Sequence, residues 1–308
     1  MILVTGAAGQ LGSEVVSELD RRKKQNMGTD VADLDITDEG AVRAFFLKHT
    51  PSCVIHCAAY TLVDKAEEEP ELCMRVNLVG TENIALACND VGAEMIYIST
   101  DYVFGGESGL RDAGTTPYET DSPAAPLQVY GRSKLQGEEA VKRRLKHHYI
   151  VRTSWVFGRT GNNFVRTVLC LSQKEAISRV VNDQIGSPTY APDLAGLLCD
   201  MVLSGKHGVF HATNEGFCSW AQFAEEIMKL SGRSCRIIPV SSEEYPAKAT
   251  RPKNSRLSKA SLDAAGFQRL PSWQDALARF LYEIGEAKET ACFRRAKNNA
   301  EYIEREKL

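Results

Sequence analysis

The chain has 308 residues, of which 43% are hydrophobic and 25% charged, and its formal net charge is −3. This composition is typical of a globular protein, and the small net charge excludes a general attraction to nucleic acid or to an anionic membrane. No apolar run approaches the ~20 residues that a membrane-spanning helix needs, and the amino terminus lacks the basic segment of a signal peptide.

Apolar runs alternate with amphipathic segments through the first half of the chain. Four runs rich in Val, Ile and Ala predict strands at residues 2–4, 53–59, 94–99 and 149–156. After the first of them, Leu11, Val15 and Leu19 fall on one face of a predicted helix. Strands that alternate with helices favour a parallel sheet with helices on both faces. The expected fold class is therefore α/β, with a Rossmann-type doubly wound sheet.

A glycine-rich segment, VTGAAGQLG at residues 4–12, follows the first predicted strand and opens the first predicted helix. In this context a GxxGxxG motif predicts a dinucleotide-binding turn. Gly6 would allow the tight turn, Gly9 would let the backbone approach a pyrophosphate, and Gly12 would let the helix pack closely. The N–H groups at the helix start favour phosphate binding.

The segment that should hold the second strand, residues 25–38, contains few apolar residues. The strand is either short and near an edge, or its register is not set by the pattern. Asp30 lies eighteen residues after Gly12, where a carboxylate would bind the adenosine ribose and favour NAD over NADP; a solvated turn aspartate is the alternative. Asp35 and Ile36 would either cover the adenine ring of the dinucleotide or form a turn with a helix cap at Thr37.

Two further motifs predict catalytic groups. The strand at residues 94–99 leads into Thr100 and Asp101, at the edge where open α/β sheets bind ligands, although a simple turn would also explain Thr100. Tyr130 stands four residues before Lys134 at the start of a predicted helix, so the two side chains share a face. We expect the lysine ammonium to lower the pKa of the tyrosine, which would suit a general acid at neutral pH. Taken alone, this pair also occurs by chance.

The pattern becomes irregular after residue 157. It predicts a helix at 192–203, a strand at 208–213, and a helix that begins after an N-cap at Ser219. We expect residues 1–156, rejoined by 190–214, to form the dinucleotide-binding domain, and residues 157–286 to form a smaller, interleaved substrate-binding lobe. The charged tail, residues 287–308, is either a solvated terminal segment or a docking segment for a partner chain.

Nine cysteines are scattered singly, and none has the spacing of a zinc site. An odd count without a pairing pattern is typical of a reducing compartment, so we expect a cytoplasmic protein.

In order along the chain, the segments GAAGQLG, ISTDYVFGG, PLQVYGRSKLQGE, VRTSWVFG, VVNDQIGSPT and RPKNSRL resemble the dTDP-4-dehydrorhamnose reductases. This family lies within the extended short-chain dehydrogenase/reductases, and the resemblance runs from residue 3 to about residue 257. It implies an oxidoreductase that uses NADPH or NADH to reduce a nucleotide-linked 4-keto-6-deoxysugar, most simply dTDP-4-dehydro-L-rhamnose to dTDP-L-rhamnose. It is compatible with a homodimer and implies no nucleic-acid or membrane partner.

The resemblance also implies roles for single residues. Tyr130 would give the proton to the sugar C4 oxygen, Lys134 would hold the nicotinamide ribose, and Thr100 would polarise the carbonyl. The remaining cofactor-binding positions would be Gly6, Gly9, Gln10, Leu11, Gly12, Asp30, Asp35, Ile36, Ala58, Ala59, Tyr60 and Asn77. The substrate-binding positions would be Thr100, Asp101, Trp155, Asn163 and Arg256. A core tryptophan is the alternative for Trp155, and a helix-facing polar residue for Asn77.

Some members of the family use magnesium in dimer contacts, and Glu14 matches one such position. The full acidic set is absent from this sequence, so we expect no essential metal.

Two other functions also fit these motifs. One is an epimerase or dehydratase of the same superfamily, but dehydratases need an acid pair near the threonine, and Tyr102 rather than Glu follows Asp101. The other is a non-catalytic regulatory subunit, such as the methionine adenosyltransferase partner that shares this fold. It would bind cofactor without turnover, and the intact Thr100, Tyr130 and Lys134 argue against it.

Overall fold

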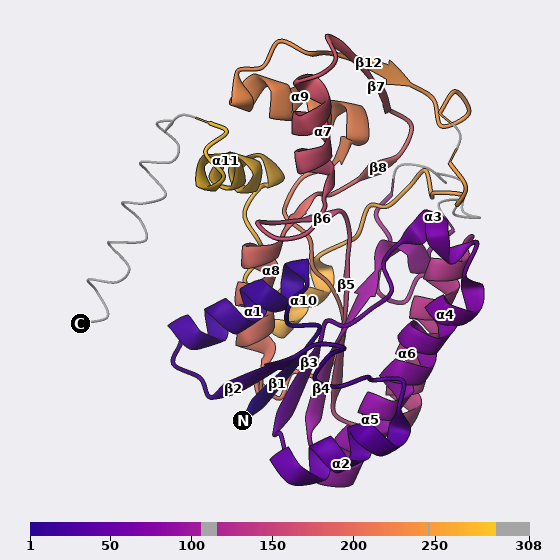
Figure 1. The fold of residues 1–308 in the computed structure, drawn as a ribbon, viewed down its shortest axis with the longest axis vertical. Helices are drawn as coiled ribbons and strands as arrows, with labels where there is room; N and C mark the ends of the chain where they lie inside the picture. The colour runs from indigo at the N-terminus through magenta and orange to yellow at the C-terminus, as the bar shows by residue number, and fades with distance from the viewer. Residues whose placement is uncertain (106–115, 246, 288–308) are drawn as a thin grey trace.

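The computed structural model describes residues 1–105, 116–245 and 247–287. Its centre is a six-stranded sheet with the order β10-β5-β4-β3-β1-β2, in which every neighbouring pair is parallel (Figure 1). The strands are β1 (Ile2–Thr5), β2 (Asn26–Thr29), β3 (Cys53–His56), β4 (Glu94–Thr100), β5 (His148–Thr153) and β10 (Gly208–His211). This arrangement confirms the predicted doubly wound α/β fold.

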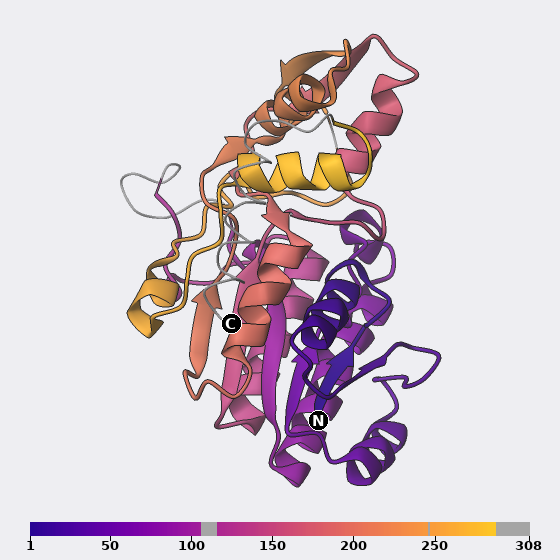
Figure 2. The same ribbon diagram turned by 90° about the vertical axis from the view of Figure 1, so that its left-hand side faces the viewer.

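Helices cover both faces of the sheet, which explains why its central strands are apolar throughout (Figure 2). One face packs against α1 (Gln10–Arg21), α8 (Ala191–Met201) and α10 (Ala260–Ala265). The other packs against α2 (Glu39–His49), α5 (Thr81–Val91) and α6 (Val129–Arg144). Alternate residues of each strand enter the two cores: in β3, Ile55 enters the first and Val54 the second.

The second strand is short and lies at the edge of the sheet, the first of the two predicted alternatives. Of the alternative given for Asp35 and Ile36, the turn is present but the helix cap at Thr37 is wrong. Asp38 is the N-cap of α2 and accepts a hydrogen bond from the backbone N–H of Ala41. Thr37 instead donates its N–H and its hydroxyl to the Asp35 carboxylate, which closes a turn before the helix.

Short helical elements follow the strands at the carboxyl edge of the sheet. After β3 the chain forms α3 (Val63–Ala66), α4 (Pro70–Met74) and the π-helical η1 (Arg75–Gly80). After β4 it forms the single 3₁₀ turn η2 (Asp101–Val103). The main chain therefore surrounds this edge with loops, the usual place for ligands in open α/β sheets.

A smaller lobe sits above this edge and has an aromatic core of its own (Figure 1). Its helices are α7 (Phe164–Ser172), α9 (Trp220–Ser231) and α11 (Trp273–Glu283). Its short strands are β6 (Val156–Phe157), β7 (Ile177–Val181), β8 (Ile185–Gly186), β9 (Thr189–Tyr190), β11 (Cys218–Ser219) and β12 (Arg236–Val240). Ser219 caps α9 in a capping box with Gln222, which confirms that predicted start.

The chain returns from this lobe to the sheet twice. Strand β10 pairs with β5, and α8 packs against α1, within the stretch 190–214. Leu262, Phe267 and Leu270 also enter the core of the sheet, although they lie within the range predicted for the lobe. The predicted domain boundaries and a homodimer stay predictions, and residues 288–308 of the charged tail lie outside the described residues. Within the described ranges, no helix combines the length and hydropathy needed to cross a membrane.

Candidate active site

A cavity of about 1220 Å³ opens between the carboxyl edge of the sheet and the smaller lobe. Strands β1, β2, β4 and β5 contribute residues at their carboxyl ends, and so does the segment that follows β3. Helix α6 contributes its first turns, and the lobe closes one side. The predicted site residues in its wall are Gly6, Gly9, Gln10, Leu11, Gly12, Asp30, Asp35, Ile36, Ala58, Ala59, Tyr60, Thr100, Asp101, Tyr130, Lys134 and Trp155. The structure therefore brings together residues that are far apart in the sequence.

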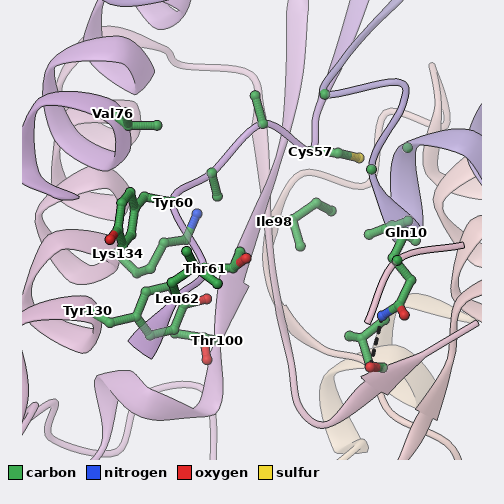
Figure 3. A pocket seen from close by; sticks show the side chains of 18 of the residues that line it. Gln10, Cys57, Tyr60, Thr61, Leu62, Val76, Ile98, Thr100, Tyr130 and Lys134 are labelled. Carbon is green, nitrogen blue, oxygen red and sulfur yellow. Dashed lines mark hydrogen bonds between the residues drawn. The ribbon is translucent and has the colours of Figure 1, made fainter. Parts of the chain in front are cut away.

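The glycine loop needs its glycines for steric reasons. Gly6 has φ +68°, and a Cβ atom there would lie 2.7 Å from the Ala58 backbone. A Cβ atom on Gly12 would lie 2.1 Å from the Gly6 carbonyl oxygen, so only glycine lets α1 start this close to the turn. Gln10 donates from Nε2 to the Val156 carbonyl, which joins the loop to the lobe (Figure 3). The start of α1 thus faces the cavity, where its free N–H groups suit a pyrophosphate.

Asp30 follows β2 and faces the same part of the cavity. Its carboxylate accepts hydrogen bonds from the backbone N–H groups of Ala8, at 3.0 Å, and Val31, at 2.8 Å. One carboxylate therefore joins the glycine loop to the end of the second strand. Asp30 is thus both a turn residue and part of the cavity wall, and its binding to the adenosine ribose stays a prediction.

Thr100, Tyr130 and Lys134 gather on one side of the cavity, opposite Gln10 (Figure 3). Thr100 ends β4, and its hydroxyl donates to the Asp101 carboxylate at 3.0 Å and lies near the hydroxyl of Tyr130 on the first turn of α6. This approach depends on Gly131, because a Cβ atom there would lie 2.1 Å from the Tyr102 carbonyl oxygen.

The pKa values of Tyr130 and Lys134 differ from those expected from the sequence. Burial raises the pKa of Tyr130 above its ordinary value and the Asp101 carboxylate adds to this, while the Thr100 hydroxyl opposes it. Burial lowers the pKa of Lys134 to about 7, against the attraction of Glu138. The prediction that Lys134 makes Tyr130 more acidic is therefore wrong in this structure, because desolvation disfavours the charged form of both groups. Tyr130 keeps its proton at neutral pH, as a proton donor must.

Asp101 lies beside Thr100 and is buried. Burial raises the pKa of its carboxyl to about 6, although the hydroxyls of Ser255 and Thr100 favour the ionised form. This group therefore changes its charge close to neutral pH, next to the expected proton donor. Such perturbed groups are typical of catalytic sites.

An aromatic wall lines the lobe side of the cavity. The rings of Trp155 and Trp220 stack with their centres 3.6 Å apart, and Phe164 lies 4.5 Å from Trp220. Trp155 has φ +51°, a left-handed conformation that is costly for a residue with a side chain, and Gly186 leaves room for its ring. This wall suits the flat faces of a base or a sugar ring.

Arg251 is the lobe's cationic residue in the cavity wall. Its guanidinium makes two hydrogen bonds to the Asp64 carboxylate, at 3.2 and 2.6 Å, across the gap between the lobe and α3. It also lies near the hydroxyl of Tyr102, whose ring packs edge-on against Tyr130 with centres 5.9 Å apart. An anionic group of a ligand can therefore meet Arg251 close to Tyr130.

The structure does not bring three predicted residues into the cavity wall. Asn77 is fully buried and bonds to both the N–H and the carbonyl of Tyr60, and Asn163 caps α7 and donates to the Gln10 side chain. Arg256 donates to the Asn254 side chain and lies over the Phe217 ring. Asn77 and Asn163 thus support cavity residues from behind rather than facing the cavity.

The possible magnesium position, Glu14, is engaged by Arg159, whose Nε and terminal nitrogen lie 2.9 and 2.5 Å from the two carboxylate oxygens. Among the described residues, no group of three or more His, Cys, Asp or Glu side chains is arranged to hold a metal ion.

A model of the family described as "RmlD substrate binding domain" matches residues 1–285 of this chain. The chain belongs to this RmlD family. The match covers both the sheet domain and the smaller lobe, so the family includes the whole cavity.

Members of the RmlD family and their relatives are similar over almost the full chain. The spore coat polysaccharide biosynthesis protein SpsK of Bacillus subtilis is 41% identical over 93% of this chain and 98% of its own. The dTDP-4-dehydrorhamnose reductase of Streptomyces griseus is 42% identical over 89% of this chain and 91% of its own. The crystal structure of dTDP-4-dehydrorhamnose reductase from Bacillus anthracis, in complex with NADP, has a TM-score of 0.87 and 40% identity, and the match covers 92% and 98% of the two chains. These comparisons confirm the resemblance predicted from the sequence motifs.

Phe164, Trp220, Arg251 and Asp64 are among the cavity residues that the sequence motifs did not predict. Arg251 lies in the segment RPKNSRL, which the resemblance includes. The resemblance implies Arg256 of the same segment, and not Arg251, as a substrate-binding residue. Trp220 directly follows the N-cap of α9, and its sequence position gives no sign that it stacks on Trp155.

Proposed function

We propose that this protein is an NAD(P)H-dependent reductase that converts dTDP-4-dehydro-L-rhamnose to dTDP-L-rhamnose. The observation that carries the proposal is the meeting, in one cavity, of a dinucleotide-type glycine loop with Thr100, Tyr130 and Lys134. Membership of the RmlD family and the similarity to reductases of this name support the choice of substrate.

Each part of the cavity has a role in the proposed reaction. The start of α1, with Gly9 and Gln10, would hold the pyrophosphate of the cofactor, and Lys134 would hold its nicotinamide ribose. A bound reduced nicotinamide supplies a hydride for the carbonyl carbon. Tyr130 gives its proton to the C4 oxygen, and Thr100 donates a hydrogen bond to the negative charge that develops there. Tyr130 then regains a proton from solvent.

The substrate would lie between the catalytic residues and the lobe. Arg251 provides positive charge for the diphosphate, and Trp155, Trp220 and Phe164 provide flat surfaces for the sugar or the base. Positioning of this kind lowers the barrier because the carbonyl, the proton donor and the cofactor are held in reactive contact.

The proposed cofactor is NADPH or NADH. Asp30 favours NADH, because a carboxylate at this position repels a 2′-phosphate. The similarity to a reductase crystallised with NADP supports NADPH. We further propose that the protein acts in the cytoplasm, which agrees with the free thiols of the described cysteines.

The proposal is tested by incubating the purified protein with dTDP-4-dehydro-L-rhamnose and either NADPH or NADH. We expect substrate-dependent oxidation of at least one cofactor and formation of dTDP-L-rhamnose, identified by nuclear magnetic resonance. A product with altered stereochemistry and no net cofactor oxidation would indicate an epimerase. Cofactor binding without any turnover would indicate a regulatory subunit.

A further inference from the structure

Glu138 lies on the same face of α6 as the catalytic pair, because Tyr130, Lys134 and Glu138 follow one another at intervals of four residues. Its side chain has no solvent exposure. A fully buried carboxylate is costly, and nothing in the proposed chemistry so far requires one at this position.

The carboxylate of Glu138 is held from two strands. Its Oε1 accepts hydrogen bonds from the Ser99 hydroxyl, at 2.6 Å, and from Arg152 Nε, at 2.8 Å. Its Oε2 accepts a second bond from Arg152, at 2.7 Å. Ser99 on β4 and Arg152 on β5 are register partners, and Ser99 lies in the cavity wall directly before Thr100. Glu138 therefore ties α6 to the two strands behind the catalytic threonine.

Arg152 is fixed in turn by further contacts. Its other terminal nitrogen donates to the Thr120 carbonyl at 3.0 Å, and its guanidinium lies 5.1 Å from the centre of the Phe104 ring. The arginine side chain is only 4% exposed. Lys142, with a side chain that is 43% exposed, also places its ammonium 3.7 Å from Glu138 Oε2. Glu138 and Arg152 themselves are shielded from solvent, so that their charges act strongly on their neighbours.

Lys134 is one such neighbour, and it is buried without a carboxylate partner of its own among the described hydrogen bonds and ion pairs. Its ammonium lies 4.1 Å from the centre of the Tyr97 ring on β4. Around it also stand His56 on β3, Cys57 directly after β3, and Cys73 on α4. Burial holds these groups neutral near pH 7: the pKa of His56 falls to about 3, and the pKa of Cys57 rises to about 12.

The pKa values of Cys73 and Tyr97 are likewise raised by burial. Glu138 is the carboxylate of this set that forms an ion pair, with Arg152, and its attraction is the strongest influence that opposes the desolvation of Lys134.

We propose that Glu138 is a positioning residue of the active site, which fixes the end of β4 through Ser99 and supplies the negative charge that keeps Lys134 an ammonium ion. The inference rests on the proposed function, in which the charged Lys134 holds the cofactor beside Tyr130. Glu138 itself touches neither substrate nor cofactor.

The test compares Glu138→Gln with Glu139→Gln, a matched control at the exposed neighbouring position. Both variants are assayed for kcat/KM across pH, because this parameter reports the ionisation of the free enzyme. In the wild type, kcat/KM should fall as pH rises through about 7, where Lys134 loses its proton. In Glu138→Gln the fall should begin about one pH unit lower, since Arg152 is left unpaired and repels the ammonium, and activity at pH 8 should drop about tenfold. Glu139→Gln should follow the wild type.

A double variant, Glu138→Gln with Arg152→Met, separates this effect from misfolding, because it removes both charges and keeps the side-chain volumes close to the originals. The pH at which its kcat/KM begins to fall should lie between the values for the wild type and for Glu138→Gln. If Glu138→Gln folds and its pH profile matches that of the wild type, the proposal is overturned. If Glu138→Gln does not fold, a wild-type pH profile in the double variant overturns it. Absence of turnover in the wild type would instead count against the proposed function.

Discussion

Two buried carboxylates lie next to the catalytic residues, and the protein holds them in opposite ways. Glu138 is paired with Arg152 through two hydrogen bonds and receives a third from Ser99. Asp101 accepts a hydrogen bond from the Thr100 hydroxyl at 3.0 Å, and no cationic side chain among the described residues hydrogen-bonds its carboxylate. The two groups are buried to a similar degree and differ in their partners.

This difference in partners explains why Glu138 keeps a fixed charge while Asp101 can exchange a proton. Because Arg152 stays charged, Glu138 has a permanent counter-ion inside the protein. Asp101 has no cationic partner among the described hydrogen bonds and ion pairs, so burial raises its pKa to about 6 and brings its titration close to physiological pH. The comparison teaches that the partner, more than the depth of burial, decides whether an active-site carboxylate acts as a fixed support or exchanges a proton.

The largest effect is expected when the paired carboxylate loses its partner. Arg152→Met leaves the buried Glu138 charge with only the partly exposed Lys142 ammonium, 3.7 Å away, so the free energy of unfolding should fall by about 3 kcal/mol. Urea denaturation at neutral pH measures this change. Adding Glu138→Leu to the same chain should restore most of the loss, and a change below about 1 kcal/mol in the single variant would show that the pair is not the support described here.

Replacing Asp101, the carboxylate without a cationic partner among the described residues, should raise the free energy of unfolding rather than lower it. The folded-state pKa of Asp101, about 6, lies above its ordinary value of 3.8, so the folded protein binds more protons than the unfolded chain between these values. Wild-type stability is therefore reduced as pH rises through this window. Asp101→Asn should raise the free energy of unfolding at pH 8 by about 1–3 kcal/mol, with little difference from the wild type at pH 4.

Urea denaturation at the two pH values tests the Asp101→Asn prediction, and turnover measured alongside should be lower than in the wild type. A variant that is less stable than the wild type at pH 8 would mean that Asp101 is stabilised in a way that its hydroxyl partners do not explain.

A third pair, Arg251 and Asp64, lies at the cavity and is partly exposed, with 25% and 44% of the side chains accessible. Arg251→Met should therefore change the free energy of unfolding by only about 0–1 kcal/mol. The kcat/KM for the nucleotide sugar should nevertheless fall about tenfold, because Arg251 positions ligand and Tyr102 beside Tyr130. Lys248→Met, which removes the neighbouring pair with Glu68, is the matched control and should keep wild-type kcat/KM.

The parts of this site that could be predicted from the sequence are local. The glycine loop, the end of β4 and the spacing of Tyr130 and Lys134 each depend on a few consecutive residues, so a short pattern predicts both the backbone and the direction of the side chains. The sheet follows from the same kind of evidence, since each strand and helix has its own periodicity. Among the strands of the sheet, only the weak second strand left its length and register open, because an edge strand needs few apolar residues.

The parts that could not be predicted depend on distant contacts. Trp155 and Trp220 are 65 residues apart, and only the packing of the lobe brings their rings together. Arg251 and Arg256 lie in one loop without periodicity, so the sequence does not show which of them faces the cavity. The pKa of Tyr130 was predicted in the wrong direction because it depends on burial by several elements, which a four-residue spacing cannot reveal.

The central claim is that Tyr130 gives the proton in a reduction that uses NADPH or NADH. The most direct measurement compares the kcat of wild type, Tyr130→Phe and the exposed control Tyr245→Phe with dTDP-4-dehydro-L-rhamnose, together with the cofactor Kd of each. We predict that Tyr130→Phe binds cofactor normally while kcat falls about 10²–10⁴-fold, as expected for loss of a general acid, and that Tyr245→Phe matches the wild type. Equal turnover by wild type and Tyr130→Phe would contradict the account.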